Sequence, residues 1–338
     1  MLSLLKEYDA AVQTIRSGAG TIIVSPGLQG RIFCEVDGTF VHRLDEAILK
    51  NPDPVEFNNF GGNSLWPAPE GGAYAYNYLA DGKWTVQPAM NRQPAQIIMS
   101  TAEQIEIAKD MQLSNRRGAD IALRFFRRIT PADIRELLNG YQLRGVAYCT
   151  DESLVPLAEY KLDDVVVSAW SLEQLPDADG VIAFGRVNGA VENCINADFY
   201  GNPHSRLSYY ENGFRFELGA ADRLQIGIKA DSQPELIGSY NPARNMLVVR
   251  YTPVRHDGRY INIADNDQPA GVYFAADQFS IFNGATLGFH ELETIAPMNS
   301  ERGRLTGSRL QSTTIILQGK ADQLKRCLHD FFKVTFVL

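Results

Sequence analysis

The segment Asn58-Asn-Phe-Gly-Gly-Asn-Ser-Leu-Trp-Pro-Ala-Pro-Glu-Gly-Gly72 is the most informative stretch of this sequence. Its glycines and prolines restrict the backbone, because glycine permits positive φ and proline fixes φ. Asn63, Trp66 and Glu70 stand among them. A tryptophan face can cover the C–H face of a sugar ring, while amides and carboxylates bind hydroxyl groups. The segment therefore predicts either a rigid loop that binds a sugar-type ligand or a structured turn with Trp66 in the core.

Short runs of Val, Ile, Phe, Tyr and Thr lie on both sides of this segment, separated by Gly, Asn, Asp and Pro. Such runs predict strands. Few helices are expected between them, which favours antiparallel sheets over β-α-β units. The expected strands are 21–24, 31–36, 104–108, 121–126, 146–149, 165–170, 180–184, 214–218, 224–229, 246–251, 272–274, 288–294 and 313–317.

A few short helices are expected at the periphery of these strands. An apolar stripe at helical spacing predicts a leading helix within residues 1–19 that ends near Gly18. An N-cap and a proline at 130–131 predict a second helix that Gly140 ends. A second apolar stripe predicts a terminal helix, followed by a last strand, within 320–338. The stripe residues are Leu5, Tyr8, Val12 and Ile15 in the first helix, and Leu324, Cys327, Leu328 and Phe331 in the last.

Length and composition favour a single domain spanning residues 1–338. The apolar fraction of 45% can supply a large core, and no linker, repeat or low-complexity segment divides the chain. The four cysteines are scattered and form no C-x-x-C pair, so zinc spacing is absent. No phosphate-binding glycine motif occurs either. We therefore expect an all-β, sandwich-like domain without a metal or other cofactor.

The charge pattern limits the expected partners. Lys plus Arg number 32 and Asp plus Glu number 40, a net charge of −8, so nucleic acid is not an expected partner. Five arginines are expected on a solvated hairpin face: Arg116, Arg117, Arg124, Arg127 and Arg128. Neither a signal-peptide apolar region nor a long apolar run is found, which favours a cytoplasmic protein without a membrane partner. The oligomeric state is left open.

Several polar residues outside the opening segment are candidates for a site. In a strand, Glu291 and Glu293 share one face, and burial of two like charges would raise at least one pKa, as suits a general base. A solvent-facing strand edge is the alternative. His290 points to the opposite face of that strand. His204 lies in a turn-rich loop, and Arg31 follows a glycine turn at the start of an apolar strand; surface positions are the alternative for both.

Four segments, taken in order, resemble the plan of one known superfamily. They are Pro26-Gly-Leu-Gln-Gly-Arg-Ile32, the Gly61–Gly72 segment, Ser168-Ala-Trp-Ser-Leu-Glu-Gln-Leu175 and Glu291-Leu-Glu-Thr-Ile-Ala-Pro297. On these motifs the chain resembles the galactose-mutarotase-like (aldose 1-epimerase-like) superfamily, and within it the bacterial domain families without an assigned function. The resemblance spans about residues 20–320.

The resemblance implies a β-supersandwich of two large twisted antiparallel sheets with a sugar-binding cleft. Members with known activity interconvert the α and β anomers of free aldoses. A late-strand glutamate is their base, which corresponds to Glu293 or, failing that, Glu291. A histidine acts on the ring oxygen and a second helps to bind, but the corresponding segments, 84–88 and 146–157, contain no histidine. His204 would have to substitute from a different loop.

These observations favour a carbohydrate-binding protein with a mutarotase-like cleft and a small-molecule sugar as partner. One hypothesis is an aldose epimerase or related isomerase; the alternative is a non-catalytic sugar-sensing or interaction module with a vestigial site. We expect Trp66 and Glu293 to face one cleft. The candidate catalytic residues are Glu293, Glu291 and His204, and the candidate substrate-binding residues are Arg31, Asn63, Trp66, Glu70 and His290.

Overall fold

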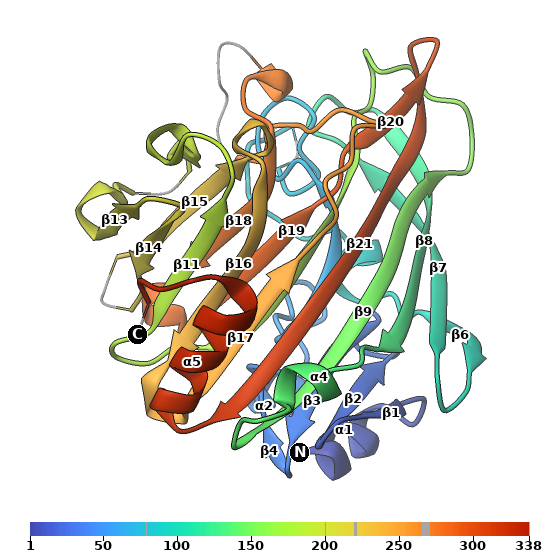
Figure 1. Cartoon of the computed structure of the whole chain (residues 1–338). Helices are drawn as coiled ribbons and strands as arrows, with labels where there is room; N and C mark the ends of the chain where they lie inside the picture. Colours follow the sequence, from blue (N-terminus) through green and yellow to red (C-terminus); the bar gives the residue numbers. More distant parts are fainter. Residues whose placement is uncertain (79, 200, 220–221, 265–270, 338) are drawn as a thin grey trace.

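Two large antiparallel sheets, packed face to face, make up most of the protein (Figure 1). The structure is a computed structural model that describes residues 1–78, 80–199, 201–219, 222–264 and 271–337. Short helices lie at the periphery of the sheets. The all-β sandwich class expected from the sequence is confirmed.

The first sheet is built from strands near both ends and the middle of the chain. Its order is β1 (Gln13–Ser17), β2 (Gly20–Ser25), β3 (Arg31–Val36), β5 (Gly62–Ala68), β10 (Ser168–Pro176), β19 (Phe289–Ile295), β18 (Asp277–Asn283), β15 (Leu224–Lys229) and β12 (Ile195–Asn196), and β4 (Thr39–Phe40) pairs with β3. The central strands β5, β10 and β19 therefore bring together the opening segment, the Trp170 motif and the Glu291–Glu293 segment.

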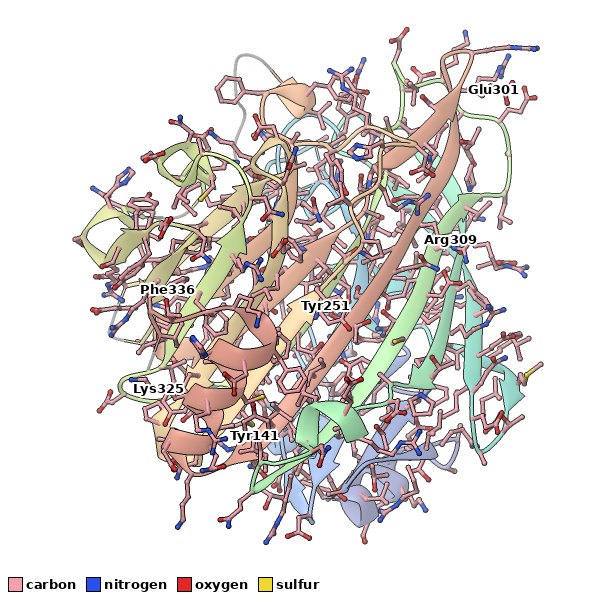
Figure 2. The ribbon with its side chains drawn as sticks, viewed as in Figure 1. Tyr141, Tyr251, Glu301, Arg309, Lys325 and Phe336 are labelled. Atoms are coloured by element: carbon pink, nitrogen blue, oxygen red, sulfur yellow. The ribbon has the colours of Figure 1, made fainter. Side chains whose placement is uncertain are left out.

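The second sheet contains the longer strands. Its order is β13 (Leu207–Tyr210), β14 (Gly213–Glu217), β11 (Ile182–Val187), β16 (Pro234–Asn241), β17 (Met246–Tyr251), β21 (Arg304–Gly319), β9 (Leu143–Pro156), β8 (Asp120–Pro131), β7 (Ile105–Ser114) and β6 (Gln96–Ser100), and β20 (Met298–Glu301) pairs with β21. Exposed side chains such as Tyr251 and Arg309 project from its outer face (Figure 2).

The helices pack around the two sheets. They are α1 (Leu2–Tyr8), α2 (Glu46–Lys50), α3 (Pro88–Asn91), α4 (Arg135–Leu138) and α5 (Ala321–Phe332). The apolar stripe of α5 packs on the second sheet, where Leu324 and Leu328 join Leu247 and Leu317 in one buried cluster. Within the described residues, no helix combines the length and the apolar character needed to span a membrane.

Most expected strands are present, but four local expectations were wrong. Residues 272–274 fall largely in a 3-10 turn, Gly271–Tyr273. The leading helix ends at Tyr8, and 13–17 form β1, whose Ile15 pairs with Ile22 of β2. Residues 130–131 continue β8, because their backbone pairs with β9, and only Arg135–Leu138 is helical. No strand forms across 333–337, where Val334 and Val337 are buried against α5 instead; Leu338 lies outside the described residues.

The opening segment is a central strand rather than a loop. Residues Gly62–Ala68 form β5, and Trp66 pairs with Trp170 of β10. Pro67 is tolerated because Ala169, opposite it, sends its N–H to Ser308 Oγ and accepts the N–H of Ala296. Gly61 has φ of +90°, and a Cβ there would lie 2.0 Å from a backbone oxygen. The glycines therefore permit entry into the strand, not the expected loop.

Charged residues lie between the two sheets as well as apolar ones. The Glu173 carboxylate accepts hydrogen bonds from Tyr148 Oη at 2.7 Å and from Asn63 Nδ2 at 2.8 Å, contacts His42, and lies 3.5 Å from Arg250 Nε. Burial opposes the charge of Glu173, yet Arg250 and these hydrogen bonds lower its pKa to about 2. Each charge in this network is thus matched by a partner.

Arg127 also lies between the sheets, which corrects the expectation of a solvated face for this arginine. It is fully buried and forms an ion pair with Glu152 at 2.6 Å. Its position on β8 alternates with Arg124 and Arg128, which face outward and pair with Asp110 and Glu106. The period of two along a strand decides which arginine is buried.

Candidate functional site

A cavity of about 550 Å³ lies on the face of the first sheet that is turned away from the second sheet. Strand β19 shows which face this is. His290 hydrogen-bonds to Ser239 at 3.0 Å and Thr294 to Ser312 at 3.1 Å, and both serines belong to the second sheet. Glu291 and Glu293 alternate with them and therefore point outward into the cavity. Loops between 43 and 84 and around 223 and 287 supply the remaining wall.

Register places the cavity residues side by side across the sheet. Glu293 of β19 is opposite Leu172 of β10, which is opposite Ser64 of β5. One step along, Glu291 is opposite Gln174. All five line the cavity. Antiparallel pairing thus converts three distant segments of sequence into one mainly polar floor.

The Glu293 carboxyl is part of this floor and is fully buried. It accepts a hydrogen bond from Trp170 Nε1 at 2.9 Å and lies 3.3 Å from Gln225 Nε2. Burial and the neighbouring charge of Glu291 raise the pKa of Glu293 well above its ordinary value. Glu293 therefore favours its protonated form more strongly than an exposed carboxyl does.

The Glu291 carboxyl has a different environment, although it is also buried. It accepts a hydrogen bond from Gln174 Nε2 at 2.7 Å. Burial raises the pKa of Glu291 to about 7, although Arg31, Arg43 and Arg223 favour its charged form. Of the two carboxyls, Glu291 therefore loses its proton first. A pair of carboxyls with opposed protonation preferences is the usual basis of an acid and a base in one site.

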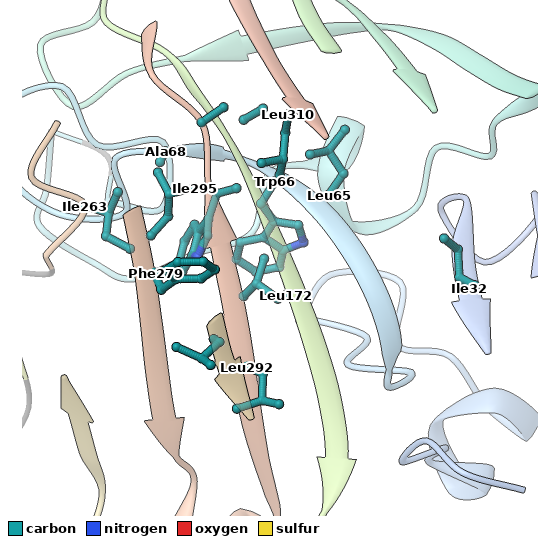
Figure 3. Close-up of a cluster of buried hydrophobic side chains, with 14 of the residues drawn as sticks. Ile32, Leu65, Trp66, Ala68, Leu172, Ile263, Phe279, Leu292, Ile295 and Leu310 are labelled. Carbon is teal, nitrogen blue, oxygen red and sulfur yellow. The ribbon is translucent and has the colours of Figure 1, made fainter. Parts of the chain in front are cut away.

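Tryptophan side chains, two from the same sheet face and Trp84 from a loop, form one side of the cavity, the tryptophan wall. The rings of Trp66 and Trp170 meet edge to face at 6.2 Å. Phe57 lies between Trp66 at 5.5 Å and Trp84 at 5.8 Å. Trp84 is 36% exposed and donates from Nε1 to Glu70 Oε1 at 3.0 Å. Trp66 lies beside Leu172 among the buried apolar side chains (Figure 3). Aromatic rings beside carboxyls suit a ligand ring that carries hydroxyl groups.

Five of the predicted site residues line this cavity: Arg31, Trp66, Glu70, Glu291 and Glu293. Trp66 and Glu293 thus share one cavity, as the sequence predicted. The catalytic and binding roles of these five residues remain predictions.

Three predicted site residues lie elsewhere. Asn63 points between the sheets, where it contacts Glu173, because it is an odd number of residues from Trp66 along β5. His290 is buried on the inner face of β19, and burial lowers its pKa to about 3. His204 is exposed in the 3-10 turn His204–Arg206 and is absent from the cavity wall.

Several cavity residues were missed by the sequence reasoning. Trp170 and Gln174 stand in a quoted motif, and alternation along a strand would have placed them on one face with Leu172. Arg43 and Arg223 come from loops, and no local pattern marks them. In the described part of the chain, no group of three or more His, Cys, Asp or Glu residues could hold a metal ion.

Comparisons with solved structures support the fold. A candidate aldose 1-epimerase from Escherichia coli K12 matches with a TM-score of 0.50 and 11% identity, over 92% of this chain and 99% of that chain. A galactose mutarotase related enzyme from Lactobacillus acidophilus matches with a TM-score of 0.49 and 10% identity, over 92% and 99%. A galactose mutarotase-like protein from Lactobacillus casei matches with a TM-score of 0.48 and 8% identity, over 91% and 99%.

The fold is therefore that of the galactose mutarotase-like proteins, as the four motifs predicted. A comparison with curated protein sequences found no match. A family model described as "Family of unknown function (DUF6786)" matches residues 1–337, and the chain belongs to that family.

Proposed function

We propose that the protein binds a monosaccharide in the cavity and interconverts its anomers. The observation that carries this proposal is the carboxyl pair Glu291–Glu293, buried on one strand face beneath a tryptophan wall. The two carboxyls have different surroundings. Glu293 lies beside Trp170 and Gln225, whereas Glu291 is influenced by Arg31, Arg43 and Arg223. The mutarotase-like fold agrees with a sugar ligand.

The protonation preferences suggest a division of roles. Glu291, as a carboxylate, would take the proton of the anomeric hydroxyl, while Glu293, as an acid, would protonate the ring oxygen. The bond between the anomeric carbon and the ring oxygen then breaks and leaves an open-chain aldehyde. Rotation and ring closure on the other face return both protons. The role of base, expected for Glu293, fits Glu291 better, because Glu293 is the more deeply buried and faces Glu291's charge.

A non-catalytic sugar-binding module is the second candidate. It is favoured by the composition of the cavity wall, since none of the described residues that line it is a histidine. In this candidate the two carboxyls only accept and donate hydrogen bonds to sugar hydroxyls. The two candidates share the binding site and differ in turnover alone.

Anomer exchange measured by NMR on a panel of neutral and acidic aldoses separates the candidates. We expect exchange faster than in buffer for at least one sugar, and a loss of about 10²–10⁴ in rate in Glu293→Gln, the range typical of general acid catalysis. Glu301→Gln, at an exposed end of β20, is the matched control and should keep the rate. Binding without exchange would favour the non-catalytic module, and the absence of binding by every sugar would contradict both candidates.

A further inference from the structure

Arg31 is a buried cation whose hydrogen bonds all go to uncharged groups. The residue is 1% exposed and lines the cavity. Nε and Nη2 donate to Gln29 Oε1 at 3.1 and 3.0 Å, and Nη1 donates to the Gly61 carbonyl at 2.6 Å. A guanidinium has five N–H donors, so two remain without an acceptor among the described residues. A buried arginine is ordinarily paired with an anion.

The neighbouring carboxylate only partly matches this charge. Glu291 favours the charged form of Arg31, but no ion pair within 4.0 Å joins them in the described structure. Glu291 instead bonds to Gln174. Burial lowers the pKa of Arg31 to about 9, a direction that indicates incomplete compensation of its charge.

Two further arginines line the cavity near Glu291. Arg43 lies 4.9 Å from the Phe289 ring centroid, and Arg223 lies 5.3 Å from that of Phe282. Both favour the charged form of Glu291, as Arg31 does. Arg43 is paired with Asp45 at 2.8 Å. The side chain of Arg223 is at the exposed rim of the cavity. The arginines thus gather around Glu291, whereas Glu70 and Glu293 accept hydrogen bonds from Trp84 and Trp170.

We propose that the ligand is an anionic monosaccharide, with its carboxylate or phosphate group at Arg31, Arg43 and Arg223 and its ring against the tryptophan wall. The inference rests on the proposed sugar site and narrows its substrate class. Arginine is suited to this task, because its planar fork binds both carboxylate and phosphate oxygens in pairs. The net charge of the whole chain, −8, favours a neutral ligand, but the local charge of the cavity decides what binds there.

Titration calorimetry with D-glucuronate, D-glucose 6-phosphate, D-glucose and inorganic phosphate tests the proposal. We expect one of the two anionic sugars to bind at least about tenfold more tightly than glucose. Arg223→Gln should weaken that binding by about 10- to 100-fold, the range for a lost hydrogen bond to a charged group, and should weaken glucose binding far less. Arg135→Gln, whose side chain is 90% exposed on α4, is the control.

The anionic sugar that binds more tightly identifies the group, carboxylate or phosphate. Arg31→Gln provides a second variant, with folding checked by circular dichroism, and should show the same selective loss. Equal affinity for glucose and both anionic sugars, unchanged in the arginine variants, would overturn the inference and leave the sugar site standing. Inorganic phosphate binding as tightly as glucose 6-phosphate would also overturn it, since the ring would contribute nothing. If no sugar binds, the proposed function itself fails.

Discussion

Replacing Glu291 by glutamine is expected to stabilise the protein at alkaline pH and to leave its stability unchanged at acid pH. The reason is that the fold holds this carboxyl where its charge is unfavourable. Burial raises its pKa from the ordinary 4.5 to about 7, and that value already includes the attraction of Arg31, Arg43 and Arg223. Glutamine keeps the size and can still accept the hydrogen bond from Gln174.

The magnitude follows from the change in pKa. A rise from 4.5 to about 7 corresponds to about 3 kcal/mol of unfolding free energy at about 1.4 kcal/mol for each pH unit. Because the folded pKa is raised, proton binding by Glu291 stabilises the folded wild-type protein. This contribution is fully present below pH 4.5 and is lost as the pH rises through 7. The variant escapes the loss, so the difference should be near zero at pH 4 and about 3 kcal/mol at pH 8.5.

Differential scanning calorimetry at the two pH values is the assay. For a chain of 338 residues, unfolding entropy is about 0.7 kcal/mol/K, so about 3 kcal/mol should raise the Tm at pH 8.5 by about 4 °C. Glu301→Gln, at an exposed position, should show no pH-dependent difference. A variant that melts at or below the wild-type temperature at pH 8.5 would refute the reasoning, as would an equal difference at both pH values.

Three further changes are informative. Glu173→Gln should lower the free energy of unfolding, measured with urea, by about 3–5 kcal/mol, because it leaves Arg250 buried without its anion. The pKa of Glu173 is lowered to about 2. The stability that this carboxylate gives the wild-type protein is therefore present above pH 4.5 and should fade as the pH falls towards 2. His204→Asn should alter neither sugar binding nor anomer exchange, and a loss of either would place this exposed residue in the site after all. Trp84→Phe removes the hydrogen bond to Glu70 and should weaken sugar binding in calorimetry by about 2- to 12-fold, while the melting temperature falls by at most about 2 °C. Undiminished affinity would exclude Trp84 from the site.

The regular parts of the fold could be predicted from the sequence because strand patterns are local. The expected strands 31–36, 224–229 and 246–251 coincide with β3, β15 and β17. The segment around Trp66 misled prediction, because its glycines and prolines are typical of loops. It forms a central strand only because β10 supplies a complete pairing partner.

Once a segment is known to be a strand, its alternation settles which residues share a face. Glu291 and Glu293 were expected together and are found together. The same rule separates Asn63 from Trp66 and His290 from Glu291, so both of these predicted binding residues lie on the inner face. Arg127 is buried for the same reason, although its neighbours are exposed.

The sequence by itself determined the strands, their period of two, the shared face of the two glutamates and the resemblance to the mutarotase-like fold. Alternation defines two faces but does not say which one is covered, and only the packing of the second sheet decided that Glu291 and Glu293 face a cavity. The tertiary structure also brought Arg43, Arg223 and Trp84 from separate loops to that cavity. It set the protonation of the carboxyl pair as well, because a pKa depends on burial and on charges that are distant in sequence.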